Sequence, residues 1–222
     1  MGKEYRVPMC TTVVQRSAVR TDVERVIIHA GVTAIEAEAF RGWTGLREVV
    51  FEAGGRLGWI GSHAFAGTAL CRVATPPGLK EIGAGAFAEC GSLRSALLNE
   101  GLRRLGSWDS RDGVFQDSAL ESVYVPSTLE AMRPNAFVGC DRLRVVEVAE
   151  GCAVDVAGCV GPAVEVRVTV AGAQSDENLR EEDGTISGRE KDETCQERAA
   201  LPQGQPGGSD RGQCEAPPEP VG

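Results

Sequence analysis

The sequence predicts a solenoid, a fold in which short, similar coils of chain stack along one axis. Three observations predict it: an apolar position recurs at nearly equal intervals, a phenylalanine recurs in step with it, and a β-branched run opens each interval. The intervals are 23, 24, 23, 27 and 23 residues long. Self-similarity at such a period is typical of repeat architectures, in which each unit packs only against its neighbours. The recurring positions are Val23, Leu46, Leu70, Leu93, Leu120 and Leu143.

Each repeat is expected to contribute one strand, because apolar residues alternate with other residues directly after the recurring position. A second apolar pair follows where the chain turns back, and an Ala-Phe or Val-Phe pair then closes the coil. Stacked coils would place phenylalanine on phenylalanine in one continuous ladder. The inward strand pairs are Val26/Ile28, Val49/Phe51, Val73/Thr75, Ala96/Leu98, Val123/Val125 and Val146/Val148; the return pairs are Val32/Ile35, Leu57/Ile60, Leu79/Ile82, Leu102/Leu105 and Leu129/Met132; the phenylalanines are Phe40, Phe65, Phe87, Phe115 and Phe137.

The repeats LKEIGAGAFAEC and LESVYVPSTLEAMRPNAFVGC carry the pattern most fully. The pattern resembles the BspA-like, treponemal-type leucine-rich repeat family, over residues 23 to about 150. The resemblance implies a right-handed α/β-type coil with a parallel β-sheet on one face and short turns or helical segments on the other. About five to six repeats of roughly 23 residues are expected. It also implies a surface-exposed or secreted protein that mediates adhesion or other protein–protein contact.

Four segments are expected along the chain. An N-terminal cap occupies 1–22, the leucine-rich repeats 23–155, a C-terminal capping strand 156–171 and an acidic disordered tail 172–222. The tail combines 12 acidic with five basic residues and has few apolar residues, so it cannot bury enough surface to fold. Within the repeats, the long fourth unit predicts a protruding loop that carries Trp108, and Gly42, Gly67 and Gly139 are expected at tight bends after Phe.

Composition excludes several classes of function. Residues 1–171 carry 18 basic and 20 acidic side chains, so no basic excess is available for nucleic acid. No apolar run is long enough to span a membrane, and no signal peptide is visible in the chain. The eight cysteines form no CxxC pair and the chain has two histidines, so neither a metal site nor a cofactor is expected.

No catalytic or metal-binding role is expected for the individual cysteines and histidines. Cys90 and Cys140 occupy the position after the Phe turn, where a small buried side chain packs in the ladder. Cys152 and Cys159 are either a disulfide, in an oxidising compartment, or separate thiols. His29 and His63 are expected to be solvated surface residues, because neither has a partner at a spacing that suggests a triad. No catalytic residue is predicted, and the 107–113 loop is a remote enzymatic alternative.

The strand residues that point outward predict a partner-binding face. The fifth position of successive strands is apolar in five repeats, which is unusual for a merely soluble surface. The third position begins with charged residues. The stripe would run about 20–25 Å at the usual strand spacing, and Tyr124 would be a candidate hot spot. The predicted face comprises Ile27, Val50, Ala74, Leu97 and Tyr124, with Arg25, Glu48 and Arg72 beside them.

We expect from this pattern a non-enzymatic protein-binding module, with adhesion or attachment to a host or partner as its role. The partner is a protein of unknown identity. Self-association through the apolar stripe and an intrachain cover over the stripe are the alternatives for that surface. The alternative for the whole protein is a periplasmic or intracellular scaffold. The compartment stays open, because the resemblance favours the cell surface, secretion or the periplasm, whereas no signal peptide is visible.

Overall fold

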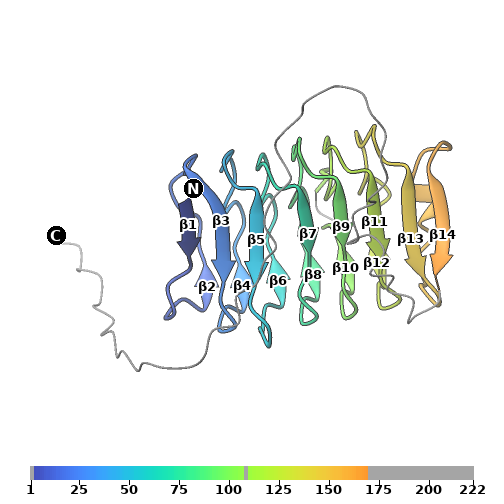
Figure 1. The fold of residues 1–222 in the computed structure, drawn as a ribbon. Coiled ribbons are helices and arrows are strands. Elements are labelled where there is room, and N and C mark those ends of the chain that lie inside the picture. Colours follow the sequence, from blue (N-terminus) through green and yellow to red (C-terminus); the bar gives the residue numbers. More distant parts are fainter. Residues whose placement is uncertain (1–2, 108–109, 170–222) are drawn as a thin grey trace, which may run out of the picture. The chain divides into compact units, whose positions relative to one another are not determined.

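The chain folds into a parallel β-solenoid of about seven turns in a computed structural model, which describes residues 3–107 and 110–169 (Figure 1). Each turn contributes one strand of three to six residues to the front of the coil. These strands pair in parallel as β1-β3-β5 and as β7-β9-β11-β13-β14. They are β1 (Lys3–Arg6), β3 (Val23–Ile28), β5 (Glu48–Phe51), β7 (Arg72–Ala74), β9 (Ser95–Leu97), β11 (Ser122–Val125), β13 (Val145–Ala149) and β14 (Glu165–Thr169).

The opposite side of the coil differs from the prediction of helical segments and turns. Two-residue strands form a second parallel sheet there, in the order β12-β10-β8-β6-β4-β2, and the one helix among the described residues is a 3₁₀ turn at Ala157–Cys159. The return pairs, three residues apart, fit either a helical turn or a short extended segment, so the sequence pattern alone did not distinguish them. The short strands are β2 (Val13–Val14), β4 (Ala34–Ile35), β6 (Trp59–Ile60), β8 (Glu81–Ile82), β10 (Arg104–Leu105) and β12 (Ala131–Met132).

The predicted core is confirmed. The return pairs are all buried, as are the inward strand pairs except Val49 and Phe51, which are half-buried. The five phenylalanines stack ring on ring with centroids 5.1–5.8 Å apart and interplanar angles of 2–15°. Backbone bonds join the same turns, since the amide of each of Phe40, Phe65, Phe87 and Phe115 donates to the carbonyl that precedes the next phenylalanine. The ladder is therefore held by both apolar packing and main-chain hydrogen bonds.

The bends after phenylalanine have the predicted conformation. Gly42, Gly67 and Gly139 have φ of 73°, 67° and 72°, in the left-handed region that glycine enters without a Cβ clash. The equivalent positions Glu89 and Asp117 also have positive φ, at 58° and 55°. All five repeats thus have the left-handed bend, and in two of them a residue other than glycine adopts this strained conformation.

The first and last described segments add further strands to the front of the coil. Within the segment expected to be an N-terminal cap, β1 pairs with β3. Within the segment expected to be a C-terminal capping strand, β14 pairs with β13 over five residues. The predicted acidic tail, 172–222, and Trp108 lie outside the described residues.

Candidate functional site

The outward residues of the front strands lie side by side, as the candidate face requires. Ala74 pairs with Leu97, and Leu97 pairs with Tyr124, on adjacent strands of the second group. Ile27 pairs with Val50 in the first group. Between the groups, β5 and β7 lie in contact without pairing in register, and the Cys71 amide donates to the Arg47 carbonyl just before these strands. The column is therefore continuous within each group and interrupted between β5 and β7.

The members of the column differ in their exposure. Leu97 is 38% exposed and Ala74 is also exposed, whereas Val50 and Tyr124 are half-buried. Ile27, expected to point to solvent, is only 7% exposed, and that expectation is corrected. An ion pair of 2.9 Å joins Arg6 on β1 to Glu52, the residue after β5, and Arg6 flanks Ile27 in the register. The accessible apolar centre is thus Ala74–Leu97–Tyr124.

Charged side chains begin the third-position column, on strands β1, β3, β5 and β7. Arg25 lies 3.2 Å from Glu48 and 3.8 Å from Glu4, so the third-position column begins as an ion-pair ladder across adjacent strands. Arg72 is exposed in the next repeat of the same column. Near Tyr124, burial and then the charges of Glu100 and Glu147 raise the pKa of the phenol. The hydroxyl therefore stays protonated and can donate a hydrogen bond to a partner at neutral pH.

His29 is a buried core residue, which corrects the expectation of a solvated side chain. The residue is 3% exposed, its Nδ1 accepts from the Gly31 amide at 3.1 Å, and its Nε2 lies 3.0 Å from the Pro8 carbonyl. This pair of partners fits the neutral ring with the proton on Nε2. The partner that buries the ring comes from 21 residues upstream, so no local sequence pattern indicated it.

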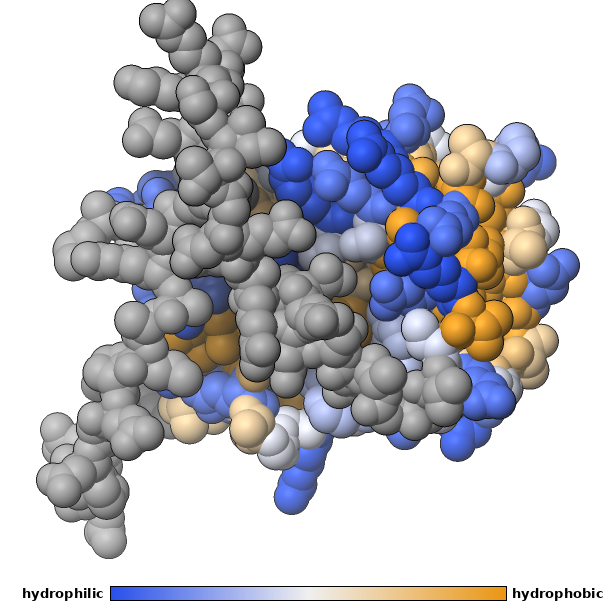
Figure 2. All heavy atoms as spheres, turned by 45° about the vertical axis from the view of Figure 1, so that its right-hand side comes forward, coloured by the Kyte–Doolittle hydropathy of each residue, from blue (hydrophilic) through white to orange (hydrophobic). Residues whose placement is uncertain are grey.

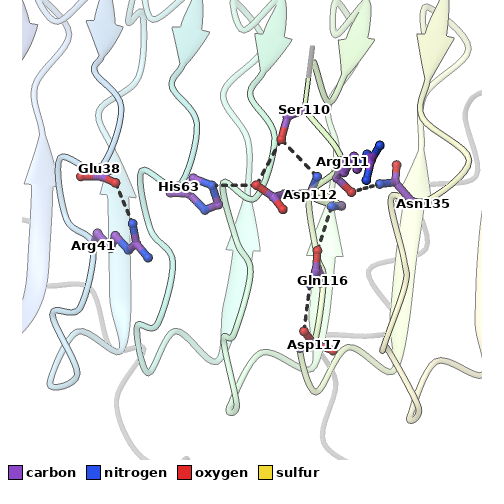
Figure 3. Close-up of polar contacts among 10 residues, drawn as sticks. Glu38, Arg41, His63, Ser110, Arg111, Asp112, Gln116, Asp117 and Asn135 are labelled. Carbon is purple, nitrogen blue, oxygen red and sulfur yellow. Dashed lines mark hydrogen bonds and ion pairs between the residues drawn. The ribbon is translucent and has the colours of Figure 1, made fainter. Parts of the chain in front are cut away.

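His63 belongs to a polar cluster around the 107–113 loop (Figure 3). Its Nε2 lies 3.2 Å from Asp112 Oδ2, across the intervening coil, where Gly85 has no Cβ to obstruct the ring. Ser110 Oγ also donates to Asp112, at 3.1 Å. His63 is thus a half-buried partner of a loop carboxylate, which corrects the prediction that it is solvated. The serine binds the carboxylate and not the imidazole, so these three side chains do not form a nucleophile–base pair.

Cys90 and Cys140 are structural, as predicted. Cys90 is fully buried, and Cys140 is 9% exposed. Their thiols donate to the carbonyls of Phe65 and Phe115, and burial raises the pKa of both thiols. A raised pKa disfavours the thiolate that nucleophilic chemistry needs.

Cys152 and Cys159 are separate thiols, so the structure contains the second of the two alternatives for that pair. Among residues 3–107 and 110–169, no group of three or more His, Cys, Asp or Glu side chains is placed to hold a metal ion. The same ranges contain no helix that is long and apolar enough to cross a membrane.

A second apolar surface, missed from the sequence, lies on the sheet of short strands. Val13, Ala34 and Trp59 pair in register there, and Val13 and Trp59 are 36% and 40% exposed. The column then becomes charged, with Arg104 3.0 Å from Glu81. In the sequence, from Ala34 onward, this column consists of the residues directly before the second member of each return pair, as Ala34 is before Ile35. It becomes visible only once those segments are recognised as strands.

Comparison with known proteins defines the class. The model of the BspA-type leucine-rich repeat region matches six copies over residues 16–144, and the chain belongs to this family. The match begins inside the segment expected to be a cap. No curated protein sequence matches the chain.

Solved structures of similar fold include bacterial leucine-rich repeat proteins. The pneumococcal vaccine antigen PcpA aligns with a TM-score of 0.61 and 22% identity, over 68% of this chain and 41% of PcpA. A leucine-rich repeat protein of Eubacterium ventriosum aligns at 0.53 and 20%, over 60% and 33%. The Treponema pallidum protein TpLRR aligns at 0.50 and 25%, over 67% and 71%. The chain thus spans less than half the length of the first two, and these likenesses concern the repeat fold.

Proposed function

We propose that this chain is a non-enzymatic protein-binding module, and that a protein partner docks on the front sheet at Ala74, Leu97 and Tyr124. The observation that carries the proposal is the exposed Leu97 between two in-register neighbours, on strands β7, β9 and β11, whose inward side chains are buried. An apolar side chain held in water by a rigid backbone loses little conformational freedom on binding. The surface is therefore suited to a partner with a complementary apolar ridge.

The neighbouring residues would set the rim of this interface. Tyr124 combines a large ring with a protonated hydroxyl, the combination found at interaction hot spots. Val50 extends the apolar area toward the first strand group, while Arg25, Glu48 and Arg72 supply charges that would steer and orient the partner. Ile27 is not part of the proposed contact, because it is buried.

The absence of catalysis is part of the same proposal. The polar cluster of the 107–113 loop is the most reactive-looking group among the described residues, and it lacks a base on its serine. The family and its structural neighbours favour a binding role over an enzymatic one.

A location at the cell surface, or beyond it, is a further part of the proposal. One structural neighbour is a vaccine antigen, which supports an exposed location by analogy. The alternative is a scaffold in the periplasm or inside the cell. Surface labelling of intact cells separates the two, because a chain that is protected until the cells are broken contradicts an adhesive role.

The binding proposal is tested by Leu97→Asp, with Trp59→Asp as the matched control on the opposite sheet. Each variant and the unaltered chain would be used to capture proteins from a cell extract, and the captured proteins quantified by mass spectrometry. We expect at least one protein that binds the unaltered chain to be lost about tenfold or more on Leu97→Asp and retained on Trp59→Asp, since a buried charge costs more than 1.4 kcal/mol at an interface. Equal capture by all three folded chains would contradict the proposal.

A further inference from the structure

The two ends of the solenoid are closed to different degrees. At the first end the inward Tyr5 is covered, with the Arg20 guanidinium 4.8 Å above its ring and Trp43 packed against its edge. At the last described strand, β14, the inward Val168 is 72% exposed, whereas Val148 beside it on β13 is 7% exposed. Figure 2 turns this end forward, and hydrophobic residues gather on the right of that view. β14 thus has the side chains of an internal strand without a further described strand to cover them.

The outer edge of β14 also has main-chain groups available for pairing. The Glu165 amide donates to Arg144, and the Thr169 carbonyl accepts from Glu150, so the odd-numbered residues bond toward β13. Because amides and carbonyls alternate in direction along a strand, Val166 and Val168 direct theirs to the open edge. No other strand in the described ranges pairs with that edge. Such an edge is a template for a strand from another chain.

We propose that β14 pairs antiparallel with β14 of a second copy of this chain, about a twofold axis through the Val166–Val166 pair. Residues 164–168 have the sequence Val-Glu-Val-Arg-Val. In this register each Glu165 lies opposite Arg167 of the other copy, twice by symmetry. Val164 lies opposite Val168, which covers the exposed valine. Opposite charges and apolar residues in directly facing positions are the pairs that stabilise antiparallel strands.

Charge selects this arrangement over its competitors. The two neighbouring antiparallel registers with correct hydrogen-bond direction would place Arg167 opposite Arg167 or Glu165 opposite Glu165, and both pairs are repulsive. In a head-to-tail stack, β1 of one copy would pair in parallel with β14 of another copy. Glu4 has the same position in the repeat as Glu165, and Arg6 has the same position as Arg167. This stack would therefore place Glu4 beside Glu165 and Arg6 beside Arg167, and both pairs are repulsive. Glu165 and Arg167 already form a two-bond ion pair of 2.8 and 2.9 Å within the exposed strand, and both groups could turn to the facing copy.

The test is a charge swap in the full chain, read by sedimentation velocity over a range of concentrations. We expect the unaltered chain to be in monomer–dimer equilibrium. Glu165→Arg or Arg167→Glu alone should raise the dimer dissociation constant about tenfold or more, because each sets two like-charge pairs across the axis. The double swap restores the opposite charges and should return the constant to within about threefold of its original value.

Thermal unfolding of the same variants shows whether they remain folded, and both side chains are exposed, so we expect no loss of fold. A chain that is monomeric at every concentration, or single reversals without effect, would overturn the proposal. Dissociation by Leu97→Asp and not by the reversals would also overturn it, because self-association would then use the sheet face. The proposed partner binding at Leu97 is independent of this result.

Discussion

The interior of the coil and the outward side of the front sheet follow opposite rules, although they alternate along the same strands. Inside, mostly apolar residues recur from coil to coil: four ring pairs stack nearly parallel, and Leu98, Val125 and Val148 succeed one another in one column. Outside, the fifth position changes from arginine through isoleucine, valine, alanine, leucine and tyrosine to glutamate and then arginine. A stacked repeat needs matched neighbours in its core and imposes no such match on its surface. Variation on the outward side is therefore where a partner can be specified.

The first consequence is that removing one central ring of the ladder should lower the free energy of unfolding more than changing any surface residue. Phe87 is fully buried, with Phe65 at 5.5 Å and Phe115 at 5.6 Å on its two faces. We expect Phe87→Ala to lower the free energy of unfolding by about 3–5 kcal/mol, since the cavity would interrupt the ladder. Thermal and urea unfolding followed by circular dichroism would measure it. A loss below about 1 kcal/mol would show that the phenylalanine ladder contributes little to the stability of the core.

A smaller effect is expected at Gly85, where interior and surface meet. Its φ is 61°, and an added Cβ would lie 2.4 Å from two atoms of the His63 ring. Gly85→Ala should cost about 1–2 kcal/mol, because it combines left-handed strain with displacement of the ring from Asp112.

Gly54→Ala is the matched control for that variant, because its φ of 72° is also left-handed and nothing lies within 4 Å of its added Cβ. We expect the control to lower the unfolding temperature less than Gly85→Ala does, since it carries the left-handed strain without the clash. If both glycine variants unfold alike, the proposed crowding between Gly85 and His63 is wrong.

The sequence allowed the interior to be predicted and left most of the surface undetermined. Periodicity indicated the phenylalanine ladder, the inward pairs and the bends at Gly42, Gly67 and Gly139, because each is a local pattern repeated many times. His29 escaped prediction because Pro8, which accepts from its ring, lies in a segment outside the repeat pattern. Ile27 was wrongly expected to be exposed, because Arg6, its neighbour in the register, lies on a strand outside the repeat pattern.

The second sheet and the last strand show two further limits of the sequence. Two-residue strands are too short for an alternating pattern, so the short-strand sheet and the exposed Trp59 were not anticipated. Alternation in β14 did indicate which side Val168 faces. It could not indicate whether another strand covers that side, because coverage depends on a neighbour and not on the strand itself.

The most direct test of the account compares two adjacent residues of β9. Ala96 is 3% exposed and faces the core, whereas Leu97 is 38% exposed and faces solvent. We expect Ala96→Asp to abolish cooperative thermal unfolding, because it buries an unpaired carboxylate. Leu97→Asp should cost about 1 kcal/mol or less and leave the fold intact. Equal destabilisation by the two variants, measured by the midpoint of thermal unfolding, would contradict the division between a structural interior and a surface free to bind.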